Sequence, residues 1–137
     1  MLYNIKTGYG EAECQPQHEL VYIVSQLPIV TTHCQKWLFT DGHARDRLTT
    51  FYDDLSQLDC IDWETVQTQY WGNTEADPDR RRRKQAEFLV RDSLPVACIE
   101  CLIVATQERK TELLQMGINV SKFIPIYIDR YHRCFYP

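Results

Sequence analysis

The chain has 137 residues and a formal net charge of -4 at pH 7, with 44% hydrophobic and 25% charged residues. This length fits a single domain over residues 1–137, and the composition is that of a soluble globular protein rather than a disordered or membrane-spanning one. No apolar run approaches the roughly 20 residues that cross a bilayer, and the first residues lack the pattern of a secretory signal, so we expect a cytoplasmic location.

The first part of the chain predicts two strands. Residues 19–25 alternate in polarity and are rich in β-branched and aromatic side chains, as in a strand that is closed by Pro28. Residues 37–39 predict another short strand, which ends at the turn signal Asp41-Gly42. A strand followed by a tight turn is therefore expected here.

A capped helix and an exposed loop are expected in the middle of the chain. Residues 48–58 are only weakly periodic, whereas Asp62 can cap a helix whose apolar residues recur at helical spacing up to Tyr70. We expect this helix to end near Trp71. Residues 72–79 are rich in glycine, asparagine, proline and carboxylates, which favours an exposed loop.

The rest of the chain predicts three more strands and a helix. An apolar run over residues 86–90 predicts a strand that opens at Glu87, and Pro95 breaks the chain after it. The remaining predicted elements are a strand at 99–105, a helix at 107–116 that ends at Gly117, and a strand at 123–128 with Ile124, Ile126 and Ile128 on one side. This order of elements predicts the α+β class.

The six cysteines predict neither disulfides nor a metal site. They are Cys14, Cys34, Cys60, Cys98, Cys101 and Cys134. Only Cys98 and Cys101 form a CxxC pair, and the four histidines are scattered without a second pair that would complete a zinc site. In a reducing cytosol we expect buried or half-buried free thiols, and no metal.

A block of five consecutive cations, from Arg80 to Lys84, holds one third of the 15 lysines and arginines. Such a block binds nucleic-acid phosphates in some proteins and forms a solvated face that pairs with nearby acids in others. Aromatic residues near it in sequence favour nucleic acid, because exposed aromatic rings stack on unpaired bases. They are Tyr52, Trp63, Tyr70 and Trp71, of which Trp71, at the entrance to the loop, is the best candidate.

Two further residues carry possible chemistry. Glu87 lies inside an apolar run, where burying a carboxylate is unfavourable unless the group is paired or used. It is either a strand-edge carboxylate paired with an arginine or an active-site group in a cleft. His43 lies in a turn after a strand, where an imidazole either contacts a base or phosphate or simply caps the turn.

The order and spacing of several motifs resemble the DarT family of DNA ADP-ribosyltransferase toxins. The motifs are TDGHA at 40–44, FYDDL at 51–55, IDW at 61–63, YW at 70–71 and RRRRKQAEFLV at 80–90. The likeness runs from Met1 to about Ile128 and is most specific at QAEFLV. It implies a mixed sheet with flanking helices of the ADP-ribosyltransferase type, NAD as co-substrate, and transfer to a base in single-stranded DNA, with thymine as the expected base.

The resemblance also implies roles for residues and a partner. Glu87 matches the family's catalytic glutamate, and Arg81 or a neighbouring arginine matches an arginine used in the chemistry or in DNA binding. His43 matches a substrate-contacting histidine, and residues 64–79 match the substrate-recognition loop. A macrodomain antitoxin is the expected partner. With the basic block and its aromatics, the candidate DNA-binding residues are His43, Tyr52, Trp71, Arg80, Arg82 and Arg83.

The chemistry of ADP-ribose transfer explains the need for a carboxylate. The bond between nicotinamide and ribose breaks, and positive charge develops on the sugar. A fixed carboxylate can accept a hydrogen bond from a ribose hydroxyl and stabilise that charge. The pyrophosphate of NAD requires arginine or backbone donors.

Members of the family have an upstream NAD-binding segment, with a histidine-containing first strand and an arginine, that this sequence does not contain. We therefore expect a chain that is N-terminally truncated relative to the family, corresponds to the C-terminal portion of the fold, and does not transfer ADP-ribose alone. Tyr3 is the candidate NAD contact. Two other function classes stay open: a non-catalytic single-stranded-DNA-binding remnant, and a metal-dependent nuclease built on Asp53, Asp54, Asp79 and Glu87, although these carboxylates lack a recognisable Mg²⁺ spacing.

Overall fold

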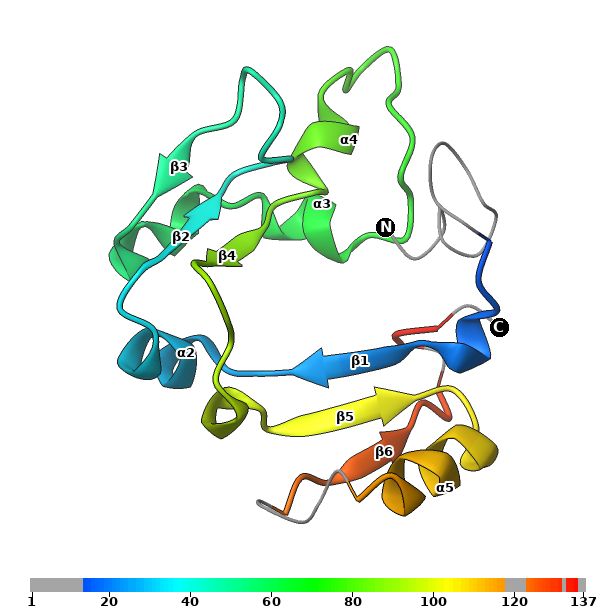
Figure 1. Cartoon of the computed structure of the whole chain (residues 1–137). Coiled ribbons are helices and arrows are strands. Elements are labelled where there is room, and N and C mark those ends of the chain that lie inside the picture. Colours follow the sequence, from blue (N-terminus) through cyan, green and yellow to red (C-terminus); the bar gives the residue numbers. More distant parts are fainter. Residues whose placement is uncertain (1–13, 118–122, 132, 136–137) are drawn as a thin grey trace. The chain divides into compact units, whose positions relative to one another are not determined.

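The computed structural model describes residues 14–117, 123–131 and 133–135. Two compact units can be distinguished, one from residues 1–33 and 95–137 and one from residues 34–94. In the described part of the chain, each unit contains one three-stranded sheet (Figure 1). The expected α+β class is confirmed, and the expectation of a single domain stays a prediction.

The sheet of the first unit is mixed. It has the order β1-β5-β6, where β1 is Val21–Val24, β5 is Cys101–Val104 and β6 is Ile126–Ile128. β1 pairs with β5 in antiparallel fashion, whereas β5 and β6 are parallel. The parallel pair requires a crossover connection, and the helix α5 (Gln107–Gln115) lies in it (Figure 1).

Helix α5 covers the core of the first unit. Thr106 caps it by accepting the N–H of Arg109 at 3.2 Å, and Gly117 follows its end with a φ of 71°, in the left-handed region that suits glycine. The helix buries Leu113 against the two parallel strands. The buried residues of this core are Leu102, Val104, Leu113, Ile124 and Ile126.

The sheet of the second unit is antiparallel and has the order β3-β2-β4. The strands are β2 (Trp37–Thr40), β3 (Phe51–Tyr52) and β4 (Phe88–Val90). Stacked aromatic rings join neighbouring strands, with ring centroids 5.5 Å apart for Trp37 and Phe88 and 5.1 Å apart for Phe39 and Tyr52. Such cross-strand pairs stabilise a short sheet.

The short helices complete the two units. In the first unit these are η1 (Gln17–Glu19), α2 (Leu27–His33) and η3 (Val96–Cys98), and in the second unit η2 (Leu55–Cys60), α3 (Trp63–Gln67) and α4 (Arg80–Arg83). No helix in the described ranges is both long enough and apolar enough to cross a membrane.

Most of the predicted strands and helices are confirmed, but strand β3, the α-helices α2 and α4 and the 3₁₀ helices η1, η2 and η3 were not predicted. Pro28 was predicted to end strand β1. It lies in the first turn of α2, where a backbone N–H has no acceptor within the helix, so proline is tolerated there. The basic block itself forms α4. The helix expected to reach Trp71 ends at Gln67. Its last carbonyls bind a lysine side chain instead of continuing the helix, as described below.

The cysteines match the expectation only in part. Cys98 is buried and Cys101 is half-buried, both as free thiols. Cys14 and Cys60 are exposed, against the expectation of burial, and Cys60 ends the surface helix η2.

Candidate functional site

The backbone of Glu87 is held by a buried threonine at the end of β2. The N–H of Glu87 donates to Oγ1 of Thr40 at 3.0 Å, and its carbonyl oxygen accepts the N–H of Thr40 at 2.9 Å. The Thr40 hydroxyl donates in turn to the carbonyl of Gly42 at 2.7 Å. Because Thr40 is fully buried, this hydroxyl ties Glu87 firmly to the turn that follows β2.

The carboxylate of Glu87 faces that same turn. Its Oε2 accepts the backbone N–H of Ala44 at 2.9 Å, and Nδ1 of His43 lies 3.8 Å away. The second distance is too long for a hydrogen bond, so the Ala44 N–H fixes the carboxylate. The side chain of Glu87 is 30% exposed and that of His43 is 41% exposed. Oε1 receives no hydrogen bond from any described residue, so one oxygen is held and the other is available to a substrate.

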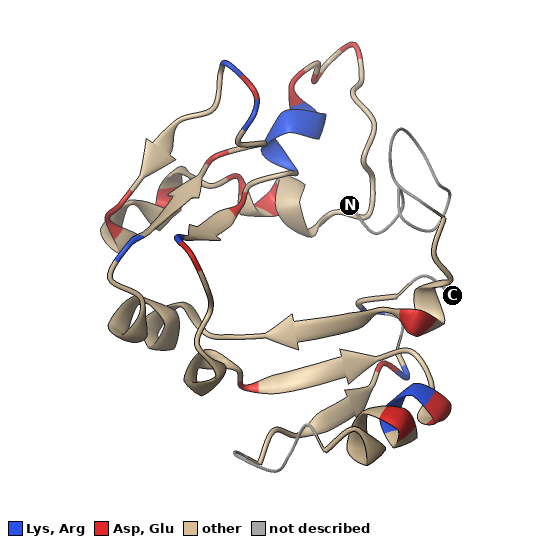
Figure 2. Cartoon of the chain, viewed as in Figure 1, with Lys and Arg blue, Asp and Glu red and all other residues tan. Residues whose placement is uncertain are grey.

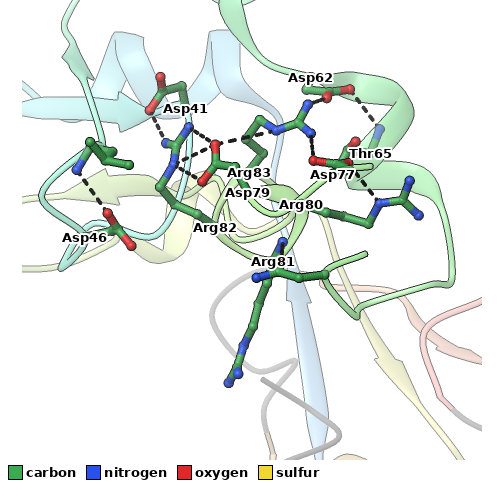
Figure 3. A network of polar contacts seen from close by, with 12 residues as sticks. Asp41, Asp46, Asp62, Thr65, Asp77, Asp79, Arg80, Arg81, Arg82 and Arg83 are labelled. Atoms are coloured by element: carbon green, nitrogen blue, oxygen red, sulfur yellow. Dashed lines mark hydrogen bonds and ion pairs between the residues drawn. The ribbon is translucent and has the colours of Figure 1, made fainter. Parts of the chain in front are cut away.

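Arg82 connects this turn to helix α4. Its guanidinium bonds Asp79 (Nη2 to Oδ2, 2.8 Å) and Asp41 (Nη1 to Oδ1, 3.0 Å), and its side chain is only 11% exposed (Figure 3). Its carbonyl oxygen accepts the N–H of His43 at 3.0 Å. The hydrogen bonds with Asp79, and then the charge of Asp79 and the bond with Asp41, raise the pKa of Arg82 above its usual range.

Gly42 leaves the space that Arg82 occupies. A Cβ atom at this position would lie 2.4 Å from Nη1 and 2.9 Å from Cγ of Arg82. A side chain at 42 would therefore displace the guanidinium from Asp41 and Asp79. The glycine of the TDGHA motif is thus explained by the close approach of Arg82 to the backbone.

Two other arginines of the block are also held by aspartates. Arg83 forms ion pairs with Asp62 and with Asp77 (Nη2 to Oδ1, 2.6 Å), and Arg80 pairs with Asp77 (Nε to Oδ2, 3.0 Å) (Figure 3). The bonds from Arg80 and then Arg83 hold the pKa of Asp77 below its usual range. These pairs match the alternative in which the block pairs with nearby acids.

Lys84 is a buried structural cation. It is 8% exposed, and its ammonium donates to the carbonyl oxygens of Thr65 (3.3 Å), Val66 (3.0 Å) and Thr68. These contacts occupy the last carbonyls of α3 and explain why that helix ends early. Burial lowers the pKa of Lys84. The ammonium also lies 4.9 Å from the ring centroid of Trp71, a cation–π contact.

Arg81 differs from its neighbours in the block. It is exposed, and its side chain forms no ion pair with a described acidic residue. Its backbone N–H donates to Oδ1 of Asn73 at 2.8 Å, and its side chain extends away from the aspartates in Figure 3. Of the four arginines in this block, Arg81 therefore has its guanidinium available.

The candidate aromatic residues lie in different environments. Trp71 is 39% exposed and Tyr70 is 56% exposed, with the guanidinium of Arg80 5.6 Å from the Tyr70 ring centroid. Tyr52 is half-buried and stacked on Phe39, and a hydrogen bond with Cys60 raises its pKa. Tyr70 and Trp71 thus present ring surface to solvent. Tyr3 lies outside the described residues.

A surface pocket lies at the far end of β2 and β4 from Glu87. Its volume is about 640 Å³, and Trp37, Leu89 and Arg91 are among its lining residues. Asp53, from the nuclease alternative, lines it, whereas Glu87, Arg81 and His43 do not. Among the described residues, no group of three histidines, cysteines or acidic residues lies in position to hold a metal ion.

The sequence predicted Glu87 and His43 as candidate site residues and a turn around His43, but it did not predict how these residues are held. Thr40, the N–H of Ala44 and the distant partners Asp41 and Asp62 were missed, whereas pairing of the block with the nearby acids Asp77 and Asp79 was one of the two alternatives. A threonine directly after an apolar strand, inside the TDGHA motif, was the available signal for Thr40. A backbone donor such as that of Ala44 leaves no signal in side-chain identity.

Comparison with known proteins links this geometry to a family. The family model described as "ssDNA thymidine ADP-ribosyltransferase, DarT" matches residues 1–136. A DNA ADP-ribosyl transferase of Escherichia coli O127:H6 is 35% identical over 84% of this chain and 53% of its own length. One of Thermus sp. (strain 2.9) is 34% identical over 85% of this chain and 54% of its own length. This chain therefore spans about half the length of the curated relatives it matches.

Solved structures agree with the sequence comparisons. Thermus sp. 2.9 DarT in complex with carba-NAD⁺ superposes with a TM-score of 0.84 at 30% identity, covering 98% of this chain and 67% of that one. The complex of the same protein with ADP-ribosylated single-stranded DNA gives a TM-score of 0.85, covering 98% of this chain and 63% of that one. The fold is thus of the expected ADP-ribosyltransferase type, and this chain belongs to the DarT family.

Proposed function

We propose that this protein is an NAD-dependent ADP-ribosyltransferase that modifies thymine in single-stranded DNA, with Glu87 as the catalytic carboxylate. The geometry of Glu87 carries the proposal: Oε2 is held by the Ala44 N–H at 2.9 Å, and the side chain is 30% exposed. Membership of the DarT family supports it. So do the complexes of the Thermus relative with NAD⁺ and with ADP-ribosylated single-stranded DNA.

Glu87 supplies the negative charge that this transfer needs. As the bond between nicotinamide and ribose breaks, positive charge develops on the sugar, and a carboxylate at fixed distance stabilises it. A base nitrogen then bonds to the same ribose carbon and loses a proton, which the carboxylate can accept. A hydrogen bond to one oxygen keeps the group oriented, and the other oxygen can bind a ribose hydroxyl.

Arg81 is the proposed second residue of the site, because its guanidinium is exposed and available for a phosphate or for the base. We propose that His43 and Trp71 contact the DNA, through a half-exposed imidazole and a half-exposed ring. Because Arg80, Arg82 and Arg83 form ion pairs with aspartates, we propose that their main role is to hold the site together. DNA contacts by these three arginines and by Tyr52, and an NAD contact by Tyr3, stay predictions.

We also propose a cytoplasmic toxin whose partner is a macrodomain antitoxin that removes the modification. The family resemblance supports this proposal. A pull-down with such a macrodomain, together with loss of label from modified DNA on its addition, tests it.

Replacement of Glu87 by glutamine tests the catalytic assignment. Because the chain alone is expected not to transfer ADP-ribose, the transfer assays use the protein with an upstream NAD-binding segment of the family restored. It is incubated with labelled NAD and a thymine-containing single-stranded oligonucleotide, and label on the DNA is followed. Glu87→Gln should lower transfer by about 100-fold or more, because it removes the charge but keeps an oxygen for the Ala44 N–H.

Asp59→Asn, at an exposed aspartate of η2 in the same unit, is the matched control and should retain full transfer. A loss of only about twofold in Glu87→Gln would overturn the assignment. DNA binding by the unaltered protein without any transfer would support a non-catalytic single-stranded-DNA-binding function instead.

A further inference from the structure

We propose that the turn from Ala44 to Thr49 is a DNA-binding surface, in which Arg45 and Arg47 bind phosphates next to the target base and Leu48 packs against an unpaired base. This inference rests on the proposed function, since it takes single-stranded DNA as the substrate. It places the phosphate contacts in the turn beside Glu87 rather than in the conspicuous basic block.

The charge distribution is the first reason. Three arginines of the block form ion pairs with aspartates, and Lys84 binds backbone carbonyls, so these cations cannot neutralise phosphates without losing partners. Arg45 and Arg47 are both exposed, and neither forms an ion pair with a described acidic residue. Figure 2 shows charged residues both in α4 and in the turn between β2 and β3. Cations with no acidic partner contribute the most binding free energy when they contact a phosphate.

The position of the turn is the second reason. Ala44 donates its N–H directly to Oε2 of Glu87 at 2.9 Å. Arg45 is the next residue, and Arg47 follows two residues later, with consecutive Cα atoms about 3.8 Å apart. Both arginines therefore start within a few residues of the atom that holds the catalytic carboxylate. A DNA strand whose base reaches Glu87 must bring its phosphates past this turn.

The turn is held in one conformation. The N–H of Asp46 donates to the carbonyl of His43 at 2.9 Å, and the N–H of Thr49 donates to the carbonyl of Asp46 at 3.2 Å. Oδ1 of Asp46 accepts the N–H of Leu48 at 3.0 Å, so this carboxylate binds the backbone and forms no ion pair with the neighbouring arginines (Figure 3). The Thr49 hydroxyl also donates to the carbonyl of His43 at 2.8 Å. A surface fixed before binding loses little conformational entropy when DNA binds.

Leu48 is the third reason. It is 73% exposed, and its backbone N–H is bound by the carboxylate of Asp46. An apolar side chain displayed this way gains free energy when it covers the flat face of a base. In a duplex that face is stacked on the next base pair, so this contact favours unpaired DNA.

The double variant Arg45→Ala/Arg47→Ala tests the phosphate contacts. Binding of a fluorescent thymine-containing single-stranded oligonucleotide is measured by anisotropy at several salt concentrations, without NAD. Affinity at low salt should fall at least tenfold, and the slope of log K against log salt should become shallower by about 1.4, for two lost contacts at about 0.7 each. Arg91→Ala, which removes an arginine with a 65% exposed side chain in the same unit, is the matched control and should change neither.

Leu48 is tested separately. Leu48→Ser should weaken binding of the single strand several-fold with an unchanged salt slope, and Leu48→Met should restore it. The side chains of Arg45, Arg47 and Leu48 form no hydrogen bond or ion pair with the described residues, so thermal unfolding of these variants should match that of the unaltered protein. An unchanged salt slope in the double variant would overturn the proposal. Because binding is measured without NAD, a failure of Glu87 as the catalytic group would leave this result intact.

Discussion

The backbone N–H of Ala44 donates a hydrogen bond to Oε2 of Glu87 across 2.9 Å and so joins the turn after β2 to the residue that precedes β4. The donor is a backbone group, so the position of this donor depends on the conformation of the turn. The buried Thr40 and the guanidinium of Arg82 are what fix that conformation. Replacing Thr40 or Arg82 should therefore change the position of the Glu87 carboxylate, although Glu87 itself is unaltered.

Thr40→Val should both destabilise the protein and lower transfer. Valine has the shape of threonine but leaves the N–H of Glu87 without its hydroxyl acceptor and the carbonyl of Gly42 without its donor. A buried polar group without a partner costs roughly 1–3 kcal/mol of unfolding free energy. Urea unfolding measures the stability, and transfer is compared at a temperature at which both proteins are folded.

Thr40→Ser is the control for this change. Serine keeps the hydroxyl and loses one methyl group, which corresponds to about 0.8 kcal/mol. It should retain most of the transfer rate. Equal loss of transfer in the serine and valine variants would show that the hydroxyl does not position Glu87.

Neighbouring arginines of the block should behave in opposite ways. Arg82→Met leaves Asp41 and Asp79 without their buried partner and should lower the unfolding free energy by roughly 2–4 kcal/mol. Arg81→Met should change stability by less than about 0.5 kcal/mol, because its side chain is exposed, yet it should weaken DNA binding or transfer. Urea unfolding measures the stability of the two variants, and titration with a single-stranded oligonucleotide measures their DNA binding. Equal destabilisation by both changes would contradict the assignment of Arg82 to structure.

The elements with strong local patterns were predictable, and the contacts that decide the site were not. The strand at 19–25 follows from alternation, and the helix at 107–116 was predicted with its end at Gly117. The sequence of the basic block does not show whether its arginines face solvent or aspartates. Two of their partners, Asp41 and Asp62, lie far from the block in sequence. The predicted end of helix α3 was wrong because of another distant contact. The carbonyls at the end of this helix bind Lys84, which lies 16 residues after Thr68.

Stability should fall on acidification because two aspartates of the network have lowered pKa values. The Thr65 backbone N–H lowers the pKa of Asp62, with Arg83 assisting, and Arg80 and then Arg83 lower that of Asp77. Below the ordinary carboxyl pKa of about 4, the unfolded chain takes up protons that these folded carboxylates resist. Their contribution is therefore fully present above that value and is lost as the pH falls through the lowered folded-state pKa.

Urea unfolding between pH 7 and pH 3 measures this dependence. Asp62→Asn keeps an N-cap for α3 but cannot form the ion pair with Arg83, so its stability should fall less steeply with acid than that of the unaltered protein. Asp59→Asn, at an exposed aspartate in the same unit, is the control and should follow the unaltered curve. Parallel curves for Asp62→Asn and the unaltered protein would show that the Asp62 pair does not contribute.

Lys84→Met should release the segment that carries Trp71. Methionine fills the space of the lysine stem but provides no donor for the carbonyls of Thr65, Val66 and Thr68, and the loss should be roughly 1–3 kcal/mol. Without the cation 4.9 Å from its ring centroid, Trp71 should become more accessible to acrylamide, which is measured by fluorescence quenching relative to a Trp71→Phe variant of each protein. Because Trp71 is proposed to stack on a base, KM for the oligonucleotide should rise several-fold, whereas kcat at saturating DNA should change little. Lys110→Met, in the other unit, is the control and should alter none of these quantities. A fall in kcat with unchanged KM and unchanged quenching would show that Lys84 does not act through Trp71.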